Sequence, residues 1–288
     1  MSLRPKLQNF VRRKWEEVRD SWLEHIPTFP SVGARPDPGL EHLQPLLDIV
    51  LPKDNGRFPD VAGLRTLTLW EAVFLFHKCS HTNLAAQRLG SQGMHSWSLF
   101  NGYHSAYLGA RGIMALLGVA LPELKGRQVA IDIYPEPLRK KSLRSLGSSP
   151  FHEFIIVPLG PLDQRDLWET FQRVINICNA TCWDIGLRQE LLDLAHQKIT
   201  PPRNRFLYRA HYWPLSDLTL DVQPSDLTGI IGTELETEDP GFLLRLSFAV
   251  YRLFEQLMGD LARYSEVIKT QLEASRCLVD SELPELSC

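Results

Sequence analysis

The sequence lacks the features that would place a protein in a membrane or outside the cell. No run of its 288 residues approaches the roughly 18 apolar residues that a membrane span requires. The segment Met1–Trp22 is charged throughout and has no apolar stretch like that of a signal peptide. The 5 cysteines are scattered, which fits a reducing compartment better than a disulfide framework. We therefore expect a cytoplasmic protein.

Motifs for cofactors and metals are also missing. The sequence has no glycine-rich loop of the kind that holds phosphates, so we expect no nucleotide or other cofactor. His77 and His81 are four residues apart and could share a metal on one helix face, but no second pair of ligands stands at a matching spacing. Hydrogen-bonded helix histidines are the better interpretation, and we expect no metal site.

The chain has no surplus of positive charge. It contains 31 lysines and arginines against 34 aspartates and glutamates, which gives a formal net charge of −3. A protein that coats nucleic acid needs a basic surface, so any contact with nucleic acid must come from a local site. Hydrophobic residues at 44% and charged residues at 23% are ordinary for a globular protein with a sizeable core.

The spacing of apolar residues predicts a mainly α-helical fold, a helical bundle with a small inserted β-element. Alternating apolar residues indicate strands at Arg127–Tyr134 and Phe154–Val157, and a third short strand is expected at Thr228–Thr233. Helices are predicted at 6–25, 67–89, 95–119, 163–177, 187–198 and 240–274. We expect an N-terminal helix with a proline-rich connector at 1–60, a helical domain with the β-insertion at 61–275, and an acidic tail at 276–288.

Small residues line one side of the helix expected at 95–119. Small side chains three and four residues apart let another helix approach closely, and glycine inside a helix is otherwise destabilising. The helices at 67–89 and 95–119 should form an antiparallel hairpin joined by a short loop. The small residues are Gly102, Ser105, Ala106, Gly109, Ala110 and Gly112.

Two segments could contact a protein partner or a second copy of the chain. The first helix has Trp15 and Trp22, which either pack against the main body or dock a partner, as aromatic residues at interfaces do. The helix at 240–274 has apolar residues at near-heptad spacing, which suits a bundle seam or a dimer contact.

The segment Thr200–Trp213 concentrates groups that bind phosphate and transfer protons. Thr200 is a natural helix N-cap, and Pro201 suits the first helical position. At 100° per residue, Arg205 and His211 lie about 120° apart and could flank a groove. Arginine grips phosphate oxygens, and histidine can give or take a proton near neutral pH. The alternative is a solvated basic helix face on which His211 caps a neighbouring element.

The spacing of Arg205 and His211 resembles the motif of the HEPN ribonuclease superfamily, an arginine followed after four to six residues by a histidine. The helix segment Tyr103–Arg111 also resembles a core helix of HEPN-like bundles. The likeness covers Leu67–Val119 and Cys182–Ala274, and Phe206 departs from the polar residue that usually follows the arginine. The resemblance implies a dimer that cuts RNA without metal in bacterial toxin–antitoxin or antiviral defence systems. A non-cleaving relative stays an alternative.

We therefore predict a candidate catalytic group in which Arg205 stabilises the phosphate, His211 moves the proton, and Asn204 and Tyr208 orient them. A competing function is that of a non-catalytic helical subunit of a larger assembly. The residues expected to bind RNA are Arg203, Arg209, Arg139, Lys140, Lys141 and Arg144, the last four from a basic loop.

Overall fold

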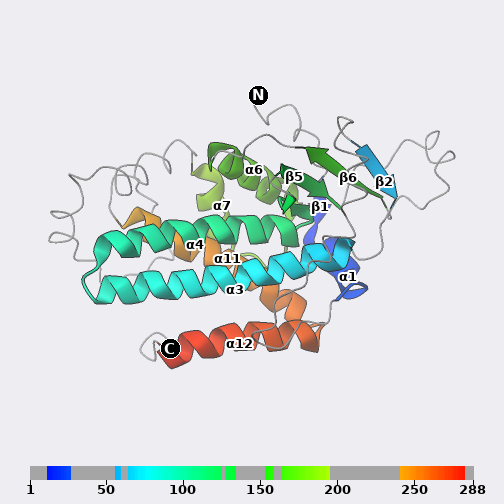
Figure 1. Ribbon diagram of the computed structural model, residues 1–288. Coiled ribbons are helices and arrows are strands. Elements are labelled where there is room, and N and C mark those ends of the chain that lie inside the picture. The colour runs from blue at the N-terminus through cyan, green and yellow to red at the C-terminus, as the bar shows by residue number, and fades with distance from the viewer. Residues whose placement is uncertain are drawn as a thin grey trace. The chain divides into compact units, whose positions relative to one another are not determined.

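The computed structural model describes residues 12–26, 56–59, 64–124, 127–133, 153–158, 164–194 and 241–282 (Figure 1). These residues form a mainly helical protein with a minor β-element, as the sequence predicts. The chain divides into two compact units. Unit 1 consists of Met1–Ala72 with Met114–Thr181, and unit 2 consists of Val73–Ile113 with Cys182–Cys288.

Unit 1 contains an antiparallel sheet in the strand order β2 (Gly56–Pro59), β6 (Glu153–Pro158), β5 (Arg127–Asp132) and β3 (Val119–Ala120). Strand β4 (Glu123–Leu124) also pairs with β5. Strands β5 and β6 confirm the two strands predicted for this region. Strand β2 was not predicted, because its four residues include a glycine and a proline and lie in the proline-rich connector. A proline fits there because β2 is an edge strand.

The N-terminal helix of unit 1 is shorter within the described residues than the sequence predicts. Arg13–Lys14 form strand β1, which pairs in parallel with β7 (Cys178–Asn179), and helix α1 covers only Trp15–Leu23. Strand β7 follows directly on helix α6 (Gln164–Ile177) in the chain.

Both tryptophans of α1 belong to the core of unit 1. Trp15 and Trp22 are fully buried, and the indole Nε1 of Trp22 donates a hydrogen bond of 2.8 Å to the carbonyl oxygen of Leu116. Of the two interpretations of this helix, the structure matches packing against the body of the chain. Neither side chain has surface left to offer to a partner.

Unit 1 also encloses an ion pair. Arg13 Nη1 lies 3.1 Å from Asp132 Oδ1, and Nη2 lies 3.2 Å from Oδ2, so the guanidinium binds the carboxylate with both arms. Nη1 also donates to the carbonyl oxygen of Leu117 at 3.2 Å. Both side chains are buried, with exposed fractions of 3% and 9%. The pair joins β1 to β5 across 119 residues of sequence.

Unit 2 contains the predicted helical hairpin (Figure 1). Helix α3 (Leu64–Ser91) and helix α4 (His95–Leu116) enter this unit over residues 73–113 and are joined by a turn at 92–94. Gly93 has a φ of 76°, a left-handed conformation that only glycine adopts without cost. The amide of Met94 donates to the carbonyl oxygen of Leu89 at 2.8 Å and closes the end of α3.

The segment expected as one long helix at 240–274 is two helices, so this prediction is wrong. Helix α11 covers Phe242–Ala262 and helix α12 covers Glu266–Glu282. The break comes at Ser265, whose side-chain oxygen accepts a hydrogen bond of 3.3 Å from the amide of Ile268 and caps α12. Helix α12 continues into the stretch 276–288, for which composition predicts an acidic tail.

Helix α11 packs closely on the glycines of α4. A methyl group at Gly102 would lie 2.8 Å from Leu244 Cδ2, and one at Gly109 would lie 2.6 Å from Val250 Cγ1. The close approach expected from the small residues of α4 is confirmed. The apolar stripe of α11 is buried in this contact and against α3, so its near-heptad spacing is explained by a bundle seam. Helix α7 (Ile185–Asp193) is capped by Asp184, whose Oδ1 accepts from the Leu187 amide at 2.9 Å.

Candidate functional site

The residues predicted for catalysis and RNA binding all lie outside the described residues. Arg203, Asn204, Arg205, Tyr208, Arg209 and His211 fall in the range 195–240, and Arg139, Lys140, Lys141 and Arg144 fall in the range 134–150. The strand expected at 228–233 lies outside them as well. These assignments stay predictions.

Within the described residues, the hairpin of unit 2 has a distinctive charge. Residues 72–122 contain no aspartate or glutamate, whereas the whole chain contains 34 such residues. The hairpin range 73–113 still carries three cationic side chains and four histidines, namely Lys78, Arg88, Arg111, His77, His81, His95 and His104. The local charge is therefore positive on a protein whose net charge is negative. The signal is present in the sequence as a long gap between acidic residues.

A row of aromatic side chains lies along α4. At 100° per residue, Trp97, Phe100 and His104 fall within about 60° of one another on the helix. The ring centroids of Trp97 and Phe100 are 5.9 Å apart, and those of Phe100 and His104 are 4.8 Å apart, both with the edge of one ring against its neighbour. Trp97 is 48% exposed, His104 is exposed and Phe100 is half-buried. We call these three residues the α4 aromatic row.

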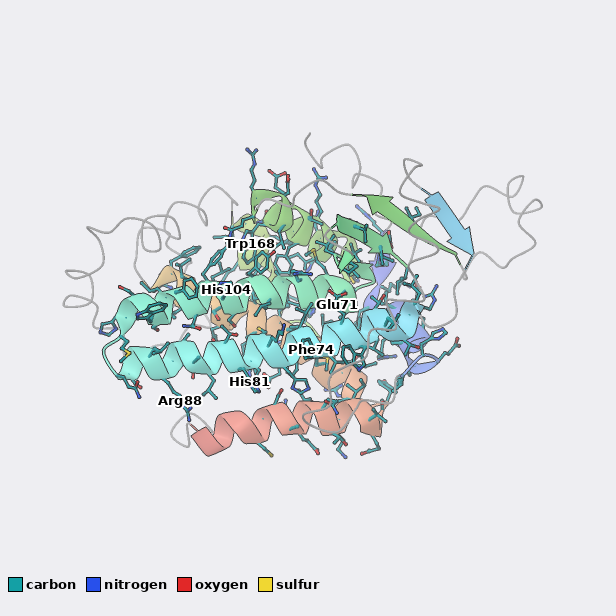
Figure 2. The ribbon with its side chains drawn as sticks, in the orientation of Figure 1. Glu71, Phe74, His81, Arg88, His104 and Trp168 are labelled. Atoms are coloured by element: carbon teal, nitrogen blue, oxygen red, sulfur yellow. The ribbon has the colours of Figure 1, made fainter. Side chains whose placement is uncertain are left out.

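The exposed face of α3 has a second set of side chains. The ammonium group of Lys78 lies 4.7 Å from the ring centroid of Phe74, which is 41% exposed. His81 is exposed and Arg88 is half-buried on the same helix. Figure 2 shows Phe74, His81 and Arg88 following α3, while His104 projects from α4. The hairpin thus offers two separate sets of cationic and aromatic groups.

His77 lies in a polar contact between α3 and α12. Its Nε2 donates to Gln271 Oε1 at 3.0 Å, because an amide oxygen can only accept, and its Nδ1 accepts from the hydroxyl of Ser275 at 2.6 Å. A histidine between a serine and an orienting group has the chemistry of a nucleophile and base. Ser275 is only 1% exposed, so a substrate cannot reach it, and the contact holds α12 to the hairpin.

The same contact makes stability depend on pH. Burial, helped by the nearby charge of His81 and opposed by the bond to Gln271, holds the pKa of His77 below its ordinary value of 6.5. The unfolded chain therefore binds this proton more readily, so the contribution is complete above about pH 6.5 and decreases as the pH falls below it.

We expect the free energy of unfolding in urea to decrease from pH 7.5 to pH 5.5 less steeply in His77→Gln than in the wild type. His104→Gln is the matched control, because His104 is an exposed histidine of the hairpin and is not among the groups that shift the pKa of His77. It should keep most of the wild-type slope. Equal slopes for wild type and His77→Gln would contradict the assignment.

Two other titratable groups lie in the core of unit 2, and a cluster of ion pairs lies nearer its surface. Burial raises the pKa of the Cys79 thiol to about 12, and the pKa of Tyr251 is raised by burial and by the nearby Glu255. Glu255 binds Arg252 at 2.8 Å and Arg276 at 3.2 Å, which links α11 to α12. These contacts explain how α12 is held on the bundle.

Among the described residues, no group of three or more histidine, cysteine, aspartate or glutamate side chains is placed to hold a metal ion. No described helix is both long and apolar enough to cross a membrane.

The chain matches no protein-family model, and no curated protein or solved structure is significantly similar to it. The function must therefore be argued from the chemistry of the chain itself.

Proposed function

We propose that this chain is a metal-independent RNA-binding or RNA-cleaving protein of the HEPN-like kind, acting as a dimer in the cytoplasm within a prokaryotic toxin or defence system. The observation that carries the proposal is the hairpin surface of unit 2, where aromatic and cationic side chains are exposed and residues 72–122 include no acidic side chain. Cationic groups attract the phosphate backbone, and aromatic rings stack on bases.

The residues at 203–211 would supply the chemistry. Cleavage without metal needs a base for the 2′-hydroxyl, an acid for the leaving 5′-oxygen and a cation for the phosphate. We assign the proton transfer to His211 and the phosphate contact to Arg205, with Asn204 and Tyr208 orienting them. Arg203, Arg209 and the basic run 139–144 would hold the RNA backbone.

Incubation of the purified chain with a mixed RNA pool in EDTA tests this function. We expect cleavage that leaves 2′,3′-cyclic phosphate ends, and we expect His211→Ala to lose it. His25→Ala is a control, because it removes a half-buried histidine outside the hairpin and leaves both the hairpin surface and the predicted catalytic group intact. A chain that neither binds nor cuts RNA would contradict the proposal, and cleavage that persists in His211→Ala would contradict the assignment of the proton transfer.

A second candidate is a non-catalytic helical subunit of a larger assembly. The observation that favours it is exposed apolar surface outside the hairpin, where Ile185 is 81% exposed, Tyr264 56% and Val267 42%. Exposed apolar side chains that gather in one patch often mark contacts with another protein. If Val267→Asp dissociates a dimer or complex while RNA is neither bound nor cut, the second function is the better one.

A further inference from the structure

The α4 aromatic row, defined above as Trp97, Phe100 and His104, is the part of the hairpin with the most specific chemistry. We infer that this row stacks on the unpaired bases of single-stranded RNA. The inference rests on the proposed function and names the form of RNA that the protein binds.

The geometry of the row suits stacking. Trp97 and His104 are seven residues apart, which places them about 10 Å apart along the helix axis, with Phe100 between them. Each ring is held by its neighbour through the edge-to-face contacts at 5.9 and 4.8 Å. Rings that are already held in place lose little conformational freedom when a ligand binds. The exposed half of Trp97 offers the large apolar surface that a base needs.

The charge around the row suits a polyanion. Helix α4 contains no acidic residue, and its one lysine or arginine is Arg111, which falls on the same side of the helix as His104 because seven residues are nearly two turns. A phosphate backbone that follows the row therefore meets no carboxylate of α4. A protein partner usually carries both carboxylates and cations. Only its carboxylates would find complementary charge on this surface, so it would gain less binding free energy than a polyanion.

The pairing state of the RNA follows from the same chemistry. Bases within a duplex are already stacked on each other, and double-stranded RNA is bound through its phosphates and 2′-hydroxyl groups. Aromatic rings add affinity only where bases are unpaired, as at single strands, loops and ends. The row therefore predicts a preference for single-stranded over duplex RNA.

Fluorescence anisotropy with a 2′-O-methyl RNA decamer tests the inference, because this probe has no free 2′-hydroxyl and cannot be cut by the proposed reaction. We expect the single strand to bind more tightly than its duplex, and Trp97→Ala to weaken binding of the single strand by about tenfold, the loss of one stacked base. Trp97→Phe keeps an aromatic ring and should recover part of the affinity. Tyr264→Ala is the matched control, since Tyr264 is an exposed aromatic residue (56%) outside the hairpin, and it should bind like the wild type.

Each other outcome overturns the inference. Equal binding by Trp97→Ala and wild type would exclude stacking on the row, and a similar loss in Tyr264→Ala would indicate a general effect of removing an exposed aromatic side chain. Binding of duplex as tightly as single strand would exclude recognition of unpaired bases. These results leave the proposed function standing, provided that RNA is bound. If the wild type neither binds the probe nor cuts RNA, both proposals fail.

Discussion

Replacement of Arg13 by alanine is expected to lower the free energy of unfolding by about 3–5 kcal/mol. The guanidinium of Arg13 is the counter-ion of Asp132, and both side chains are buried, with exposed fractions of 3% and 9%. Without Arg13, the carboxylate stays buried with its charge uncompensated, and the carbonyl oxygen of Leu117 loses a donor. Urea unfolding of the full chain, followed by circular dichroism, measures the loss.

The pair Lys14–Glu17 supplies the control, because it lies next in the sequence and is exposed. Its nitrogen and oxygen are 3.8 Å apart, and the side chains are 69% and 66% exposed. Glu17→Ala should change the free energy of unfolding by less than about 1 kcal/mol. The double variant Arg13→Met, Asp132→Leu removes both charges together and should be more stable than Arg13→Ala alone. Equal effects of Arg13→Ala and Glu17→Ala would contradict the structure of this pair.

This ion pair shows which contacts the sequence could not predict. The alternation of Val129, Ile131 and Ile133 predicts strand β5, and the period of two also suggests that Asp132 faces water. Asp132 is buried instead, because strand β1 brings Arg13 to it from 119 residues away. Local spacing predicts the type of an element, but it does not identify the partner that an element will find.

Helix ends show the same limit at shorter range. The apolar stripe of 240–274 continues with helical spacing across residue 263, so it predicts one helix. Ser265 followed by Glu266 is a helix-start signal inside that stripe, and it decides where α12 begins. The stripe alone was insufficient, because apolar spacing can continue across a turn: α12 folds back on α11, where Arg276 contacts Glu255 at 3.2 Å.

The candidate site was predicted from local motifs, and these lie at 134–150 and 195–240, outside the described residues. The described hairpin was predicted as an element, with its glycine-lined contact, but not as a surface. The positive charge of the hairpin results from the absence of carboxylates. Sequence motifs consist of residues that are present, so no motif marks this absence. The exposure of Trp97 depends on which side of α4 meets α11, which three-dimensional packing decides.

We expect Gly112→Ala to lower the free energy of unfolding by about 1–3 kcal/mol. A methyl group at Gly112 would overlap the ring of Phe254 and lie 3.0 Å from Leu75 Cβ. The ring has little room to move away, since Phe254 is fully buried and packs edge-on against Phe76 at 5.2 Å. Alanine stabilises a helix by about 1 kcal/mol relative to glycine. The measured change is therefore the destabilisation caused by the overlap minus this stabilisation.

Gly259 separates these two contributions. It lies within α11, and a methyl group there would have no atom within 4 Å. Gly259→Ala should therefore raise the free energy of unfolding by up to about 1 kcal/mol, so the same chemical change has opposite signs at the two glycines. Phe254→Leu makes room beside Gly112, and the double variant should cost less than the sum of the two single changes. If Gly112→Ala is as stabilising as Gly259→Ala, helices α4 and α11 do not approach each other as closely as described, and the hairpin surface built on their contact would have to be reassigned.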